Sequence, residues 1–132
     1  MKKIILVLLM AISFSTSFAQ FEKKNNENLN GQSANPVSYR LFPTQNIWTF
    51  IKLDTRNGQM WQVQFNMKSE GRFVTFLNPD PLVTKEKEVK DRFTLYPTQN
   101  IYTFILLDQL EGKTWQVQWS TDIETRAIIP IE

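Results

Sequence analysis

Cysteine and histidine are both absent from the 132 residues of this sequence. Without cysteine there is no disulfide framework, no thiolate metal site and no attached c-type haem. Without histidine there is no imidazole metal ligand and no hydrolase in which a histidine activates the nucleophile. A strong excess of charge is also missing, since 15 Lys and Arg stand against 13 Asp and Glu. Nucleic acid is therefore not an expected partner, because its binding depends on surplus basic side chains.

A hydrophobic run long enough to cross a membrane is missing too. The apolar stretch from Ile4 to Ile12 follows Lys2 and Lys3, and it is shorter than the roughly 20 residues of a spanning helix. Small residues precede the bond after Ala19, so residues 1–19 are predicted to be a secretory signal peptide. Its removal leaves 13 charges of each sign. We expect an exported protein, periplasmic or extracellular, without a lipid anchor or an integral membrane segment after cleavage.

What the sequence does contain is an internal repeat. Residues 38–78 align with residues 92–132 at a shift of 54 positions without a gap, and 18 of the 41 pairs are identical. Residues 43–46 (Pro-Thr-Gln-Asn) return as residues 97–100, and residues 61–64 (Trp-Gln-Val-Gln) return as residues 115–118. Such a match predicts a tandem duplication.

The segments outside the two copies differ from them in composition. Residues 20–36 are rich in Asn, Lys, Glu and Ser, which predicts a flexible N-terminal arm. Residues 79–91 join the copies and include a charged stretch, which predicts an exposed linker with room for a short helical turn. Residues 37–132 are therefore expected to form a single domain.

Turn residues divide each copy into four short strands, which in the first copy are predicted at residues 38–42, 47–53, 60–65 and 72–77. The Pro-Thr-Gln-Asn segment follows the first strand. An Asp and a Gly four residues later bound the next turn, where Gly supplies a positive φ. The third strand alternates strictly, with Trp61, Val63 and Phe65 on an apolar face and Gln62 and Gln64 opposite.

These strands predict an all-β fold of two tandem four-stranded antiparallel meanders. The second strand has apolar side chains on both faces, so a single sheet cannot bury them all. We expect the copies to pack about a pseudo-twofold axis as a β-sandwich or a partly closed barrel. Pro130 in the last strand predicts a sheet edge, because proline lacks an N–H. A β-propeller is the alternative, but propellers have about 4 to 8 blades, so a two-blade chain would need self-assembly.

One repeated pattern resembles a known motif. Leu-Asp, three residues, Gly, two residues, Trp, one residue and Val occur at residues 53–63 and again at residues 107–117. This LDxxxGxxWxV pattern resembles a β-hairpin motif of many small secreted bacterial proteins. The resemblance implies a hairpin over about a dozen residues of each copy, and it implies no agreed activity.

Asp54 and Asp108 belong to this motif and are the only acids, apart from Glu70 and Glu124, that recur in both copies. A twofold axis could bring them together as a carboxylate pair for acid–base chemistry. The stronger interpretation is structural, since an Asp that opens a turn accepts hydrogen bonds from backbone amides two or three residues on. We expect no catalytic residues, no cofactor and no metal, because no run of closely spaced oxygen ligands is present.

The candidate ligand-binding residues are the repeated polar loop and the aromatic residue behind it: Thr44, Gln45, Asn46 and Trp48 in the first copy, and Thr98, Gln99, Asn100 and Tyr102 in the second. A turn needs the Pro and the Asn but has no evident need for the Thr and the Gln. These could contact the other copy or a ligand. Trp48 and Tyr102 could stack on a sugar or a peptide, or belong to the core. The repeated Gln side chains are expected to form an amide ladder on the solvent face.

These features favour a non-catalytic, secreted or periplasmic interaction module that binds a protein, a glycan or its own copies. An envelope or assembly subunit that pairs through free sheet edges is the first alternative. A small hydrolase or lyase that uses Asp54, Asp108 and Tyr102 is the second. The partner itself is not identified by the sequence.

Overall fold

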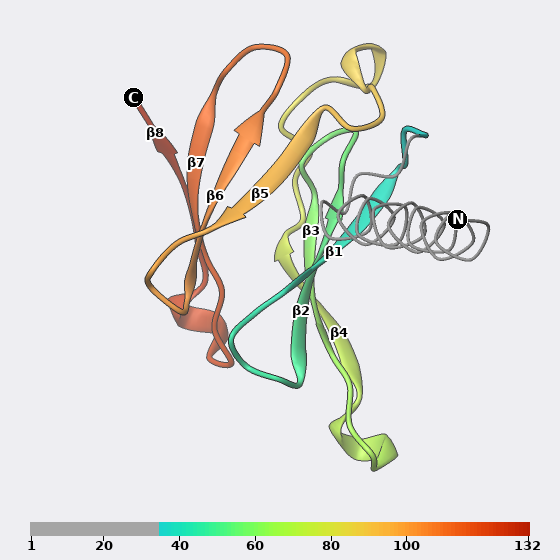
Figure 1. Ribbon diagram of the computed structural model, residues 1–132, viewed down its shortest axis with the longest axis vertical. Coiled ribbons are helices and arrows are strands. Elements are labelled where there is room, and N and C mark those ends of the chain that lie inside the picture. The colour runs from blue at the N-terminus through green and yellow to red at the C-terminus, as the bar shows by residue number, and fades with distance from the viewer. Residues whose placement is uncertain (1–34) are drawn as a thin grey trace, which may run out of the picture. The chain divides into compact units, whose positions relative to one another are not determined.

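The computed structural model describes residues 35–132, so the predicted signal peptide and nearly all of the predicted arm lie outside the described residues. The first sheet contains β1 (Tyr39–Pro43), β2 (Thr49–Asp54), β3 (Met60–Gln64) and β4 (Phe73–Asn78). The second contains β5 (Phe93–Pro97), β6 (Thr103–Asp108), β7 (Thr114–Gln118) and β8 (Ala127–Ile131) (Figure 1). The predicted all-β fold of two four-stranded antiparallel meanders is confirmed.

Three short 3₁₀ helices interrupt the connections. η1 (Ser69–Gly71) and η3 (Ile123–Thr125) lie between the third and fourth strands of the two sheets, and η2 (Lys85–Lys87) lies in the linker. None of the helices in residues 35–132 has the length and apolar character of a membrane span. The linker is mostly exposed, as expected, although Leu82 and Val83 pack against the core.

Turn chemistry explains why the hairpins form where they do. Gly58 and Gly112, which end the turns after β2 and β6, have φ of 82° and 73°. This left-handed conformation strains any residue with a Cβ, so the predicted role of both glycines is confirmed. The proline of β8 lies on an edge strand, because the strand order is β5-β6-β7-β8.

The two sheets have the same register, so each position of one has an equivalent in the other. Phe50 of β2 pairs with Val63 of β3, as Phe104 of β6 pairs with Val117 of β7. Because side chains alternate along a strand, each sheet has two faces, which we call front and back. The front face contains the positions of Tyr39, Leu41, Phe50, Lys52, Trp61, Val63, Val74 and Phe76 in the first sheet and of their equivalents 54 residues later in the second. The back face contains the positions of Phe42, Ile51, Leu53, Gln62 and Thr75 and their equivalents.

The sheets pack with non-equivalent faces. The back of the first sheet and the front of the second supply one shared core, made of Ile51, Leu53, Met60, Leu77, Phe93, Leu95, Phe104, Leu106, Val117 and Trp119. A twofold axis would bury equivalent positions, yet Leu106 is fully buried while its equivalent Lys52 is partly exposed. The predicted pseudo-twofold relation is therefore wrong, and the second sheet follows the first as in a stack.

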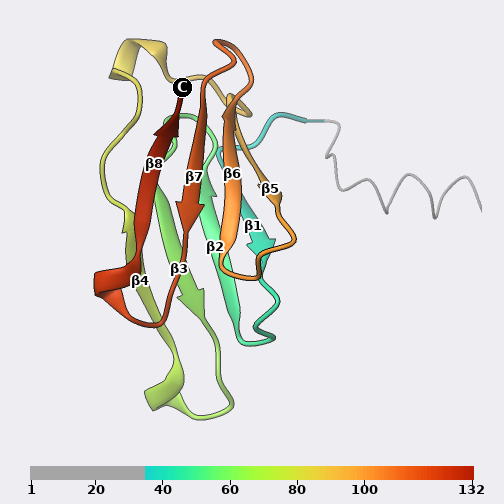
Figure 2. The same ribbon diagram turned by 90° about the vertical axis from the view of Figure 1, so that its left-hand side faces the viewer.

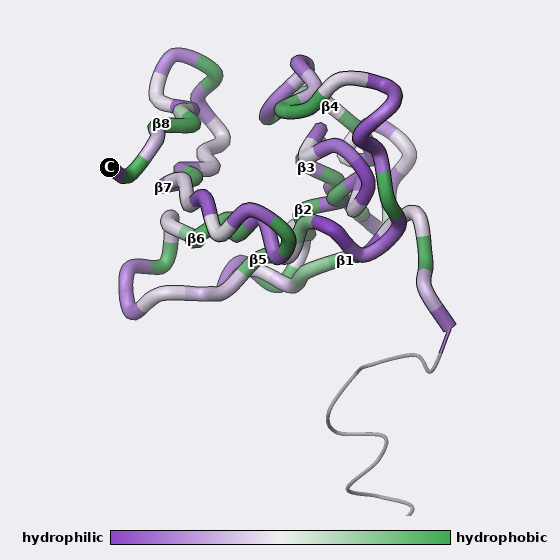
Figure 3. Tube along the Cα trace, turned by 90° about the horizontal axis from the view of Figure 1, so that it is seen from above, coloured by the Kyte–Doolittle hydropathy of each residue, from purple (hydrophilic) through white to green (hydrophobic). Residues whose placement is uncertain are grey.

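The direction of the strands agrees with this stacking. β3 and β7 are equivalent and point the same way, seen most clearly in Figure 2. β2 contacts β5 and β4 contacts β8, and in the end-on view of Figure 3 the two rows of strands come together near β2 and β5. No strand of one sheet pairs with a strand of the other among residues 35–132, so the two sheets do not close into a barrel.

The linker reinforces the contact between the sheets. Asp91 has a φ of 61°, and its carboxylate accepts hydrogen bonds from Arg40 at 3.0 Å and 3.2 Å. Its backbone N–H donates to the Thr55 hydroxyl at 3.0 Å, and the N–H of Phe93 donates to the carbonyl of Thr55 at 2.8 Å. Residues 36–132 form one compact unit.

Candidate functional site

The two Pro-Thr-Gln-Asn loops lie at the same end of the stacked sheets and have the same internal hydrogen bonds. The Thr44 hydroxyl lies 2.8 Å from the carbonyl of Thr49 and accepts from the N–H of Asn46 at 3.1 Å. Asn46 Oδ1 accepts from the N–H of Trp48 at 2.9 Å. The second loop repeats these bonds at equivalent positions through Thr98 and Asn100, to Thr103 and Tyr102. The Thr side chains therefore stabilise their own turns, which explains their repetition without a ligand.

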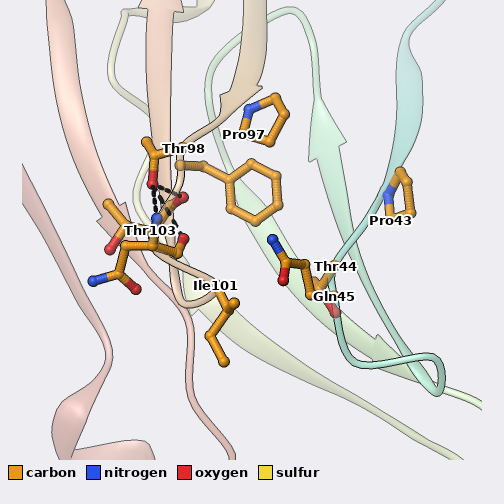
Figure 4. Close-up of a pocket in the computed structure, with 9 residues that line it drawn as sticks. Pro43, Thr44, Gln45, Pro97, Thr98, Ile101 and Thr103 are labelled. Atoms are coloured by element: carbon orange, nitrogen blue, oxygen red, sulfur yellow. Dashed lines mark hydrogen bonds between the residues drawn. The ribbon is translucent and has the colours of Figure 1, made fainter.

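A small pocket of about 230 Å³ separates the two loops. It is lined by Pro43, Thr44, Gln45, Pro97, Thr98, Asn100, Ile101, Thr103 and Phe104. Figure 4 shows the side chain of Gln45 lying between the loops. Four of the eight predicted binding residues thus lie together at this pocket, whereas Asn46, Trp48, Gln99 and Tyr102 are not among its lining residues. The volume is smaller than the roughly 300 Å³ at which sites for small organic ligands begin.

Trp48 and Tyr102 are half-exposed and pack on a neighbouring aromatic ring. Trp48 lies 5.2 Å from Phe65 between ring centroids, and Tyr102 lies 5.3 Å from Trp119. Trp119 is buried and donates its indole N–H to the carbonyl of Ile101 at 3.0 Å. In the second copy one ring of the pair, Trp119, is therefore part of the core while Tyr102 stays at the surface, whereas in the first copy both Trp48 and Phe65 are at the surface.

A second candidate surface is the front face of the first sheet. Tyr39, Leu41 and Phe76 on this face are 52%, 59% and 54% exposed. Trp61 lies between Tyr39 and Phe76, with centroid distances of 6.4 Å and 5.8 Å. Lys52 lies across this row, with its ammonium 4.4 Å from the centroid of Trp61.

Sequence reasoning placed this face in the core, and the structure corrects that placement. Trp61 and Val63 were expected to be buried and Gln62 to face solvent, but Gln62 is fully buried while Trp61 is partly exposed. The expectation is correct in the second copy, where Val117 and Trp119 are buried. Lys52 was the available signal, because an unpaired lysine in the middle of a strand face is not expected in a core.

Gln62 and Thr49 lie on the buried back face of the first sheet. Neither the amide nitrogen and oxygen of Gln62 nor the hydroxyl of Thr49 has a hydrogen-bond partner among the described residues. The predicted solvent-exposed amide ladder is therefore wrong for Gln62. Its equivalent Gln116 is on the back face of the second sheet and is only partly buried.

Asp54 and Asp108 both open a hairpin turn, as their structural interpretation requires. Asp54 Oδ1 accepts from the N–H of Arg56 at 3.0 Å, and Asp108 Oδ1 accepts from the N–H groups of Leu110 and Glu111 at 3.0 Å and 3.2 Å. Each carboxylate also binds a guanidinium at 2.7 Å, from Arg56 in the first copy and from Arg92 in the second.

These contacts keep both carboxyl groups ionised. Burial alone would raise the pKa of Asp54, but the Arg56 guanidinium and the Arg56 backbone N–H outweigh it and hold the pKa below its ordinary value. Burial acts in the same direction on Asp108, and Arg92 with two backbone N–H groups again lowers the pKa. Among residues 35–132 no three or more acidic side chains are grouped so that they could hold a metal ion.

Comparison of the chain with known protein families, curated proteins and solved structures gave no match.

Proposed function

We propose that the chain is a non-catalytic, exported interaction module that binds a macromolecular partner through the front face of its first sheet. The observation that carries the proposal is the exposure of Tyr39, Leu41, Val74 and Phe76, each more than half accessible to solvent on one face. A contiguous exposed apolar surface is typical of an interaction site, whereas single exposed apolar residues are not informative.

The second sheet supports this proposal by contrast. On its front face Phe93 and Leu95, the equivalents of Tyr39 and Leu41, are buried in the core that it shares with the first sheet, as are Phe104 and Leu106. Ile128, the equivalent of Val74, is partly buried, and Pro130, the equivalent of Phe76, is exposed. In the second sheet the front face therefore forms an apolar contact with a neighbouring sheet. In the first sheet no segment of residues 35–132 covers the equivalent face. Aromatic rings on a rigid sheet supply a large contact area with little loss of side-chain entropy.

The acidic residues support a role other than catalysis. A general acid or base needs a pKa near the working pH and a proton to exchange, but the pKa values of Asp54 and Asp108 are lowered by arginines. Tyr102, the third candidate, packs on Trp119. A carboxylate-dependent hydrolase or lyase therefore has no suitable acid in Asp54 or Asp108.

Binding through a face is also favoured over binding through a sheet edge. Proline is present on three of the four edge strands, as Pro43 in β1, Pro97 in β5 and Pro130 in β8. Because proline cannot donate to a neighbouring strand, only β4 offers an edge without it. The predicted edge-pairing subunit is accordingly the weaker proposal.

Photo-crosslinking in the cells that express the protein tests the proposal. A benzophenone amino acid replaces Leu41 or Val74 on the front face, and a matched control replaces the exposed Lys85 of the linker. The expected result is a discrete adduct from both front-face positions and none from the control. Absence of any adduct at Leu41 and Val74, at normal protein levels, would contradict the proposal.

A further inference from the structure

The stacking of the two sheets leaves two outer faces that correspond to the two inner ones. Inside the chain, the back of the first sheet packs on the front of the second. The faces left outside are the front of the first sheet and the back of the second. The exposed front of the first sheet is equivalent to the front of the second sheet, where Leu106 is buried. The outer back of the second sheet is equivalent to the back of the first sheet, where Ile51 is buried.

We propose that the partner of the front face is a second copy of this chain, which binds it through the back face of its second sheet. This inference rests on the proposed function and names its partner. The contact between two chains would repeat the contact between the two sheets of one chain. The sheets of successive chains would then form one continuous series.

The back face of the second sheet has the side chains that such a contact requires. Tyr96 and Ile129 are 53% and 51% exposed, and they occupy the positions of Phe42 and Thr75, which lie on the covered back of the first sheet. Ile105 and Leu107 are identical to Ile51 and Leu53, two fully buried core residues. Two apolar residues that are fully buried in the first copy therefore recur in the second copy as partly exposed residues, beside the exposed Tyr96 and Ile129.

An arginine gives an independent reason for the same geometry. Arg126 reaches from the second sheet to the first, where its guanidinium lies 3.1 Å from the carbonyl of Phe76 and 3.2 Å from the Thr75 hydroxyl. Its equivalent Arg72 is exposed, and its guanidinium has no hydrogen bond to the residues described. The equivalent of the Phe76 carbonyl is that of Pro130. Arg72 of one chain would thus donate to Pro130 of the next.

Lys52 limits the strength of this contact. Its equivalent Leu106 is fully buried between the sheets, whereas the ammonium of Lys52 lies over the ring of Trp61. Covering the face removes water from this charge, which is unfavourable unless the side chain extends to the rim. The bond between Arg40 and Asp91 of the linker is also missing between separate chains. Association should therefore be reversible and depend on concentration.

The contact is head to tail, because two different faces meet. Such heterologous contacts close into rings or continue as open filaments, unlike the isologous contact of a twofold dimer. Repeated four-stranded sheets in a closed ring would form a β-propeller, in which a chain of two sheets reaches the usual 4 to 8 blades only by self-assembly.

Two blocked variants test the geometry by sedimentation velocity. Val74→Arg places a charge on the exposed front face, and Ile129→Arg places one on the exposed back face. The wild-type mass should rise with concentration, either to a ring of defined size or to filaments. Each variant alone should be monomeric, and an equimolar mixture should form a 1:1 dimer, because each variant keeps one intact face. Far-UV circular dichroism and thermal unfolding confirm that both variants are folded.

A third variant strengthens the contact. Lys52→Leu copies Leu106 and should tighten association by about tenfold or more, because it replaces a charge by a buried apolar side chain. Self-association of either blocked variant alone would overturn the head-to-tail contact. So would a monomeric state of both the wild type and Lys52→Leu at concentrations of about 1 mM.

The photo-crosslinking experiment separates this inference from the proposed function. An adduct at Leu41 with twice the mass of the chain supports both. An adduct with a different protein or with a glycan, together with monomeric wild type and Lys52→Leu, supports the proposed function and overturns the second copy as partner. Absence of any adduct, together with monomeric protein, overturns both.

Discussion

The buried amide of Gln62 leads to a stability prediction of unusual sign. Gln62 is fully buried between the sheets, and neither polar atom of its amide has a partner among the described residues. Methionine is also unbranched and has a closely similar length and volume, so Gln62→Met should leave no cavity. The substitution should therefore stabilise the folded protein, whereas most core substitutions destabilise.

The size of the effect follows from the cost of an unpaired polar group. Mutational data place this cost at about 1–3 kcal/mol for a buried amide without a hydrogen bond. Removing the amide of Gln62 should raise the free energy of unfolding by about that amount. For a domain of this size, each kcal/mol corresponds to a rise of about 4–8 °C in Tm. The matched control is Gln116→Met, at the equivalent but partly exposed position, where the change should stay within about 0.5 kcal/mol.

Urea unfolding followed by tryptophan fluorescence measures both variants, at a concentration where the protein is monomeric. A higher unfolding midpoint for Gln62→Met with an unchanged m-value reports greater stability rather than a change in compactness. If Gln62→Met is no more stable than Gln116→Met, the amide of Gln62 has a hydrogen-bond partner in solution, and the reasoning from its burial is refuted.

Three further predictions concern the turns. Asp108→Ala should lower the free energy of unfolding by about 1.5–3 kcal/mol in urea unfolding, because it removes the closer of the two carboxylates that pair with the buried Arg92 and leaves only Glu111 at 3.1 Å. The lowered pKa values of Asp54 and Asp108 mean that their stabilisation is complete above the ordinary Asp pKa near 4. It is lost as the pH falls through the lower folded values, so the wild-type urea midpoint should decrease between about pH 4 and pH 2. In thermal unfolding, Gly58→Ala should cost more than Gly112→Ala. Both positions strain a Cβ, but only that of Gly58 would lie 2.7 Å from Leu82, while that of Gly112 meets open space.

The strands and turns could be predicted from the sequence because their causes are local. Alternation predicted β3 and β7, and the glycine after each second strand predicted a positive φ that the structure has at Gly58 and Gly112. The structural interpretation of Asp54 and Asp108 was confirmed for the same reason, since their bonds go to amides two and three residues away. The Thr hydroxyl bonds within the repeated loops were missed, although they also are local.

The packing of the two sheets could not be predicted from this local pattern of strand and turn residues. Gln62 and Gln116 have identical neighbours on both sides, yet one is fully buried and the other is partly exposed. Their burial is decided by which sheet lies against each face, and that is a long-range property of the duplicated chain. The candidate binding face was misplaced for this reason, because Trp61 and Trp115 were given the same environment.

The differences between the copies, rather than their identities, carry the information about packing. Where the buried front has Leu106 and Trp119, the exposed front has Lys52 and Phe65. Identical sheets could stack on one another without limit. Lys52 on one outer face weakens the contact with a further sheet, while the apolar side chains around it remain. This face therefore combines an apolar surface with a charged side chain that weakens its association. The combination fits reversible association better than permanent burial. It also explains why the exposed front face of the first sheet has apolar residues that are typical of a core.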